Sequence, residues 1–124
     1  MKLWRQALRN PWVQLVLLIT CVSLAAQWWQ ARGERHIGER VAAAVAPGEL
    51  RMISSESCGF CTLARGWFRE HRVAYEECFV ERDAACRAEF DRLGAQGTPV
   101  IVVRGQPQLG FNPTRIARVL GVGG

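Results

Sequence analysis

Two cysteines separated by two residues, Cys58 and Cys61, restrict most strongly what this chain can fold into. They stand where a short apolar strand pattern, residues 50–54, gives way to a helical pattern. The unpaired backbone N–H groups of a helix start favour a thiolate, and they can lower a cysteine pKa from about 8.5 by one to several units. A Thr98–Pro99 dipeptide follows later in the chain. The cysteine pair therefore predicts thiol–disulfide exchange chemistry.

Length and charge limit the other possibilities. The 124 residues suffice for one small domain and an appendage. The formal net charge of +5 raises the question of nucleic acid as a partner. However, the arginines of residues 65–118 are interspersed with acidic residues. Much of the basic excess comes from residues that flank an apolar run, namely Lys2, Arg5, Arg9, Arg32, Arg35 and Arg40. We therefore expect no nucleic-acid binding.

The apolar run near the N-terminus predicts a membrane helix. Residues 12–26 carry no charge. As a helix, residues 11–29 would extend roughly 28 Å, close to the thickness of a hydrocarbon core of about 30 Å. Tryptophans lie at both ends of this run, where an aromatic belt is expected: Trp4, Trp12, Trp28 and Trp29. We therefore expect one membrane-spanning helix, formed by residues 11–29.

A cleaved signal peptide is the alternative interpretation of the same run. The small residues around Ser23 and Ala25 would suit a cleavage site. The length of the run, and the tryptophans directly after it, favour an uncleaved anchor. Three Lys or Arg residues lie on each side of the run, and the amino terminus adds one positive charge before it. This slight bias places the N-terminus in the cytoplasm. The expected location is the inner (cytoplasmic) membrane, with the domain on the periplasmic or exterior side.

Three segments follow from this reading. Residues 1–30 are the anchor or signal peptide, residues 31–48 are a helical, alanine-rich connector, and residues 49–124 are the folded domain. Pro47 and Gly48 end the connector. We expect the connector to act as a spacer.

The domain pattern alternates between strands and helices. The expected elements are strands at residues 50–54, 73–80, 100–103 and 108–110, with helices from Cys58 or Cys61 to His71, from Asp83 to Gly94, and from Asn112 or Thr114 to Leu120. This β-α-β-α-β-β-α order predicts an α/β fold, in which helices flank a four-stranded mixed sheet.

Residues 50–120 resemble the glutaredoxin family, and in particular its small glutaredoxin-like redoxins. Three motifs carry the resemblance: the Cys-x-x-Cys pair that opens the first helix, Thr98–Pro99 before the third strand, and Gly110-Phe111-Asn112-Pro113 before the last helix. The resemblance implies a thioredoxin-like fold and a thiol–disulfide oxidoreductase. It also implies a cis bond before Pro99, beside the active-site disulfide, where a substrate strand could pair with the Thr98 backbone. The substrate-binding residues would be Phe60, Thr98, Pro99, Gly110 and Phe111.

The resemblance weakens where glutathione would bind. Dithiol glutaredoxins carry a basic residue shortly before the cysteine pair and acidic residues at the last helix. Here the pair follows Ser-Ser-Glu-Ser, and Gly110-Phe111-Asn112-Pro113 contains no acid. We therefore expect no cofactor, with glutathione weakly supported as a reductant. The expected partners are protein disulfides or thiols and an upstream electron donor, and the protein is expected to be a monomer.

Within the pair, Cys58 is expected to be the nucleophile and Cys61 to resolve the mixed disulfide. No titratable side chain separates the two cysteines, so the helix start must stabilise most of the thiolate charge. Ser55 and Ser57 could add hydrogen bonds, whereas the Glu56 carboxylate would oppose the negative charge.

Two further cysteines, Cys78 and Cys86, lie at the end of a strand and in the first turn of the next helix. A structural disulfide between them is geometrically plausible. The alternative is that both are ordinary small buried residues. Zinc binding by all four cysteines is disfavoured, because their spacing fits no common zinc site. We therefore expect no metal.

Three functions remain in competition. The leading hypothesis is a membrane-tethered oxidoreductase that reduces or exchanges disulfides in protein substrates. The second is a cytoplasmic-facing, glutathione-dependent glutaredoxin. The third is a non-catalytic binding module, which would keep full function in a Cys58→Ser variant.

Overall fold

The computed structural model describes residues 10–124, so Lys2, Trp4, Arg5 and Arg9 lie outside the described residues. One long helix precedes the strands. The elements are α2 (Pro11–Ala44), β1 (Leu50–Ser54), α3 (Gly59–Glu70), β2 (Glu76–Phe79), α4 (Ala84–Arg92), β3 (Val100–Val103), β4 (Gln106–Leu109) and α5 (Pro113–Val119). From β1 onward, this order confirms the predicted β-α-β-α-β-β-α sequence.

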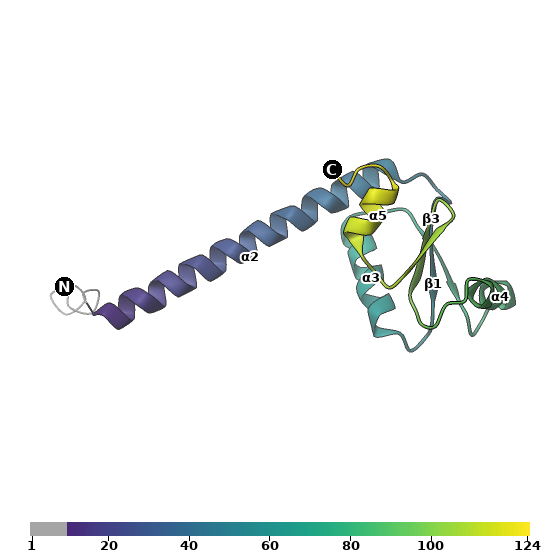
Figure 1. Cartoon of the computed structure of the whole chain (residues 1–124), viewed down its shortest axis with the longest axis horizontal. Helices are drawn as coiled ribbons and strands as arrows, with labels where there is room; N and C mark the ends of the chain where they lie inside the picture. Colours follow the sequence, from purple (N-terminus) through teal and green to yellow (C-terminus); the bar gives the residue numbers. More distant parts are fainter. Residues whose placement is uncertain (1–9) are drawn as a thin grey trace. The chain divides into compact units, whose positions relative to one another are not determined.

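The four strands form one mixed sheet in the order β2-β1-β3-β4. β1 runs parallel to β2 and antiparallel to β3, and β3 and β4 are antiparallel. In the register, Ile53 of β1 lies between Cys78 and Val100. Because side chains alternate along a strand, Met52 and Ile53 point to opposite faces. Figure 1 shows α3 and α5 on one face of the sheet and α4 on the other.

Each face of the sheet carries its own hydrophobic core. The larger core joins Met52 and Ile101 to Phe68 of α3 and Ile116 of α5, all of them fully buried. The smaller core lies under α4 and consists of Ile53, Val100 and Cys86, with partly buried neighbours. Helix α3 therefore packs in the larger core on one face of the sheet, and α4 covers the smaller core on the other.

The C-terminal end of α2 packs into the larger core. Val41 is fully buried there and Val45 nearly so. Gly38 is buried against His71, and a Cβ atom at this glycine would lie 2.2 Å from the His71 ring. The compact unit therefore begins at Arg35, earlier than the boundary expected at residue 49. Residues that the sequence describes as a spacer thus supply part of the core.

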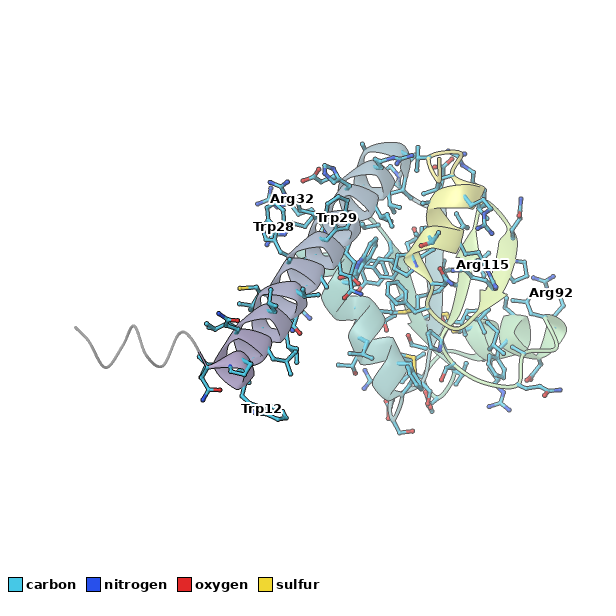
Figure 2. All side chains as sticks on the ribbon, turned by 60° about the vertical axis from the view of Figure 1, so that its left-hand side comes forward. Trp12, Trp28, Trp29, Arg32, Arg92 and Arg115 are labelled. Carbon is cyan, nitrogen blue, oxygen red and sulfur yellow. A yellow bond between two sulfur atoms is a disulfide. The ribbon has the colours of Figure 1, made fainter. Side chains whose placement is uncertain are left out.

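The N-terminal part of α2 is a separate unit with an exposed apolar surface. The helix is long and apolar enough, by length and composition, to cross a membrane. Trp12 lies near one end of this segment, and Trp28 and Trp29 lie toward the other (Figure 2). The Arg32 guanidinium stands 3.9 Å above the Trp28 ring. An aromatic side chain next to a cationic one is typical of a membrane interface.

Two strands, β2 and β4, have bounds that differ from the expectation. Val73 lies in the turn that caps α3 and not in β2, because its N–H donates to the Phe68 carbonyl at 2.9 Å. Arg72, with φ of 55°, makes the left-handed turn that this helix ending requires. β4 begins at Gln106 instead of residue 108, because Gln106 is the register partner of Val103.

Candidate active site

Cys58 is the N-cap residue of α3. Its backbone is extended, with φ of −92° and ψ of 106°, and its Sγ accepts a hydrogen bond from the Cys61 N–H at 3.0 Å. The sulfur therefore occupies the place of the side-chain oxygen in an ordinary helix cap. A negative charge at this position would be stabilised by that N–H and by the positive end of the helix dipole.

Cys58 and Cys61 form a disulfide, with Cα atoms 5.2 Å apart. Their exposure is unequal, because Cys61 is fully buried and Cys58 is only half-buried. Gly59 and Phe60 beside them are exposed, and Phe60 is 70% exposed. An incoming thiol or disulfide therefore reaches the sulfur of Cys58 before that of Cys61.

The other expected binding residues lie on two connected loops. The Thr98–Pro99 bond is cis, as the resemblance implies, and Pro99 is buried beside the half-buried Thr98. The Gly110 N–H donates to the Pro99 carbonyl at 2.8 Å and ties the two loops together. Phe111 then packs against Trp67 of α3, with ring centroids 5.5 Å apart. Phe60, in contrast, remains exposed.

The second pair of cysteines is also joined. Cys78 of β2 and Cys86 of α4 form a disulfide with Cα atoms 6.0 Å apart. Cys86 is 3% exposed and contributes to the smaller core. In residues 10–124, no group of three or more His, Cys, Asp or Glu side chains is arranged to hold a metal ion.

Comparison with known proteins agrees with this geometry. The glutaredoxin family model matches residues 50–107, which include both disulfides and the cis-proline. The chain contains a glutaredoxin domain. It is similar to the glutaredoxin-like protein NrdH of Lactococcus lactis subsp. lactis, with 23% identity over 70 residues. That match covers 56% of this chain and 97% of the relative.

A solved structure gives the same result for the fold. The thioredoxin-like protein BC3987 is 25% identical, with a TM-score of 0.51, and the match covers 56% of this chain and 97% of that one. A variant of that protein has a TM-score of 0.54 at 25% identity, and covers 60% of this chain and 97% of its own. The glutaredoxin domain therefore has a thioredoxin-like fold, and the protein is a glutaredoxin-like thiol–disulfide oxidoreductase.

Sequence reasoning did not identify two residues that contact the loop before Cys58. The Ser55 hydroxyl donates to the Glu81 carboxylate, and the Glu56 N–H lies 3.3 Å from both Glu81 oxygens. The Arg82 guanidinium donates to the Glu56 carboxylate. Ser55 is thus bonded to Glu81 instead of the Cys58 sulfur, and Arg82 partly balances the charge of Glu56.

These contacts also act on Glu81 itself. The hydrogen bonds from the Ser55 hydroxyl and the Glu56 N–H hold the pKa of the Glu81 carboxyl below its ordinary value, because they stabilise the carboxylate. Ser55 and Glu81 are 26 positions apart. No local pattern could therefore have paired them.

A second set of polar contacts links α3 to the sheet, and the sequence did not predict it either. The fully buried Ser54 donates to the Glu77 carboxylate at 2.6 Å, and Arg65 donates to the same oxygen at 2.9 Å. Arg65 lies one helical turn after Cys61, so this ion pair fixes the first turns of α3 to β1 and β2. Burial, followed by the negative charge of Glu77, raises the pKa of Tyr75.

Removing the second disulfide of the glutaredoxin domain is expected to lower its stability. The bond closes a loop with a sequence separation of 8, and loop closure of this size contributes about 2–3 kcal/mol. The full-length Cys78→Ser/Cys86→Ser variant in detergent should therefore show that loss in urea unfolding under non-reducing conditions. Cys58→Ser/Cys61→Ser, which opens a shorter loop, is the matched control. Equal midpoints for wild type and Cys78→Ser/Cys86→Ser would contradict the expectation.

Proposed function

We propose that this protein is a membrane-tethered thiol–disulfide oxidoreductase that reduces or exchanges disulfides in protein substrates. The observation that carries the proposal is the Cys58–Cys61 disulfide, which joins a half-buried cysteine at a helix N-cap to a fully buried one. The exposed apolar part of α2 supports the tether. The glutaredoxin domain would face the periplasm or an equivalent exterior space from the inner (cytoplasmic) membrane.

The chemistry proceeds in two balanced exchanges. The Cys58 thiolate attacks one sulfur of a substrate disulfide, forms a mixed disulfide and releases the other sulfur as a thiolate. The Cys61 thiolate then attacks the Cys58 sulfur, which re-forms the Cys58–Cys61 disulfide and releases the second substrate thiolate. Two electrons pass to the substrate, and its two thiolates take up protons. An upstream dithiol or reductase must return two electrons before the next cycle.

Protein substrates fit this site better than glutathione does. Phe60 offers an exposed apolar surface next to Cys58, and the Thr98–Pro99 loop offers backbone groups for pairing with an extended chain. The position that would need an acid to hold the glutathione amino group is occupied by Asn112. Its side-chain oxygen already accepts the Arg115 N–H at 3.0 Å as the cap of α5. Gly110 and Phe111 complete the proposed binding surface.

The resting redox state of both cysteine pairs in intact cells tests this function. Cells are quenched in acid, free thiols are alkylated, and peptide masses report each pair separately. An oxidised Cys78–Cys86 pair with reduced Cys58 and Cys61 is expected for an exterior reductase or isomerase. An oxidised Cys58–Cys61 pair would indicate a disulfide donor, or a reductase without its electron supply. Four reduced thiols would favour a cytoplasmic, glutathione-dependent enzyme and contradict the proposed orientation.

The tether is tested on the same cells. The full-length chain is expected to stay in the membrane fraction after alkaline carbonate washing, with residues 1–30 still present by intact mass. External protease should digest the glutaredoxin domain only when the outer permeability barrier is opened. A soluble cytoplasmic marker and a periplasmic one serve as controls. A shortened, soluble product would identify residues 1–30 as a cleaved signal peptide.

A further inference from the structure

We infer that the turn between β2 and α4, residues 80–83, is a positioning element for Cys58, held by the Cys78–Cys86 disulfide and acting through Glu81. This inference rests on the proposed role of Cys58 as nucleophile. It gives the second disulfide a part in the reaction besides its contribution to stability.

The turn is fixed at its own two ends. Cys78 of β2 is bonded to Cys86 of α4, so the strand and the helix on either side of the turn are covalently joined. Asp83 accepts hydrogen bonds from the Ala85 N–H at 2.8 Å and the Cys86 N–H at 3.2 Å, which cap the helix. The Asp83 N–H donates to the Phe79 carbonyl at 3.0 Å. The backbone at residues 80–83 is therefore determined by α4 and by the disulfide.

The turn is also bonded to the loop that ends at Cys58. The Val80 N–H donates to the Ser54 carbonyl at 3.0 Å and extends the pairing of β2 with β1. One residue further, the Glu81 carboxylate accepts the Ser55 hydroxyl and the Glu56 N–H. The Ser55 carbonyl in turn accepts the Cys58 N–H at 3.3 Å. Two hydrogen bonds through one residue, Ser55, therefore connect Glu81 to the backbone of Cys58.

The position of the Cys58 backbone matters because its sulfur is a helix cap. The Sγ receives the Cys61 N–H at 3.0 Å in the extended conformation of Cys58. A displacement of about 1 Å in a reacting group can cost a factor of about 100 in rate. The negative charge of Glu81 acts in the opposite direction, because a nearby carboxylate disfavours a thiolate. Loss of positioning should slow the reaction of Cys58, whereas loss of the negative charge should speed it up. Substitution of Glu81 separates these two effects.

The first experiment compares Glu81→Ala with Glu81→Gln in the full-length protein in detergent. The Cys58–Cys61 pair is reduced with limiting dithiothreitol, and peptide mass verifies that Cys78–Cys86 stays bonded. The rate of Cys58 alkylation by iodoacetamide is then followed across pH. Glu81→Ala should slow alkylation about tenfold at neutral pH and raise its pH midpoint, because the loop loses its anchor. Glu81→Gln should react at least as fast as wild type, because its amide oxygen still accepts both hydrogen bonds.

The matched control is Glu76→Ala, which removes an exposed glutamate at the other end of β2 and should leave the profile unchanged. Equal rates for Glu81→Ala and Glu81→Gln would overturn the inference, because charge alone would then explain the result. A wild-type rate for Glu81→Ala would overturn it as well.

The second experiment removes the disulfide. Cys78→Ser/Cys86→Ser should reproduce the slower alkylation of Glu81→Ala, and adding Glu81→Ala to it should produce little further change, since both act through one path. The inference would be overturned if the two changes slowed alkylation additively, or if Cys78→Ser/Cys86→Ser alone reacted at the wild-type rate. Circular dichroism shows whether this variant is folded, and the two Glu81 variants keep the test decisive if it is not. Failure of the proposed function is seen separately, as turnover that survives in Cys58→Ser.

Discussion

Replacing Cys58 with serine is expected to abolish disulfide reduction by the full-length protein, to below about one-thousandth of the wild-type rate, because a hydroxyl cannot replace the attacking thiolate. Cys58 is the half-buried cysteine at the start of α3, whereas Cys61 is fully buried and cannot take over its role. Reduction of a model protein disulfide such as insulin, driven by an added dithiol, measures the loss. Turnover that persists in Cys58→Ser would exclude Cys58 as the nucleophile and favour a non-catalytic binding module.

The partner variant Cys61→Ser is expected to give a different result. The first attack remains possible, but the mixed disulfide can no longer be resolved, so covalent adducts with substrate proteins should accumulate. Non-reducing electrophoresis and mass spectrometry identify these adducts. Cys21, the free and exposed cysteine of α2, could form unrelated disulfides, so each variant is also made with Cys21→Ser. If Cys61→Ser traps no adduct, the two-step mechanism is wrong.

Truncation before residue 49 is expected to destabilise the glutaredoxin domain strongly. A fragment of residues 35–124 keeps Val41 and Val45 in the larger core, whereas a fragment of residues 49–124 leaves their neighbours exposed. Burial of two valines contributes about 3–6 kcal/mol, which is a large share of the roughly 5–15 kcal/mol of a typical domain. Urea unfolding of both fragments, followed by circular dichroism, measures the difference. Equal stability would show that the end of α2 is a spacer.

A point substitution tests the same packing without removing any residue. Gly38→Leu in the longer fragment places a side chain where a Cβ already lies 2.2 Å from the His71 ring, and should cost about 1–3 kcal/mol. Gly66→Leu is the matched control, because a Cβ at this exposed glycine of α3 would meet nothing within 4 Å. The control should be neutral or slightly stabilising, since glycine is a poor helix former.

The sequence predicts well what depends on neighbouring residues. The order of strands and helices follows from the spacing of apolar residues, and the start of α4 follows from the local capping tendency of Asp83. The cysteine pair at the start of α3 and the family resemblance are read from short motifs. What these predictions share is a dependence on a few consecutive positions.

Features that depend on tertiary contacts could not be predicted. The sequence alone indicates a spacer for the alanine-rich segment before Pro47. Only the folded structure shows that Val41 lies in the larger core and that Gly38 packs against His71. The role of Glu81 depends on a side-chain contact with Ser55, 26 positions away. The pairing of Cys78 with Cys86 stays undecided in the sequence, because spacing alone does not say whether the two side chains face each other.

The contact between Trp67 and Phe111 gives the glutaredoxin domain an internal optical probe. Phe111 follows the loop that is bonded to Pro99, and its ring centroid lies 5.5 Å from that of Trp67. The other four of the five tryptophans precede residue 35, so Trp67 is the only tryptophan in a fragment that begins there. A substrate that moves the Gly110–Phe111 loop would change the indole's surroundings and hence its emission. Binding could then be followed in real time on the unlabelled protein, separately from the disulfide exchange that comes after it.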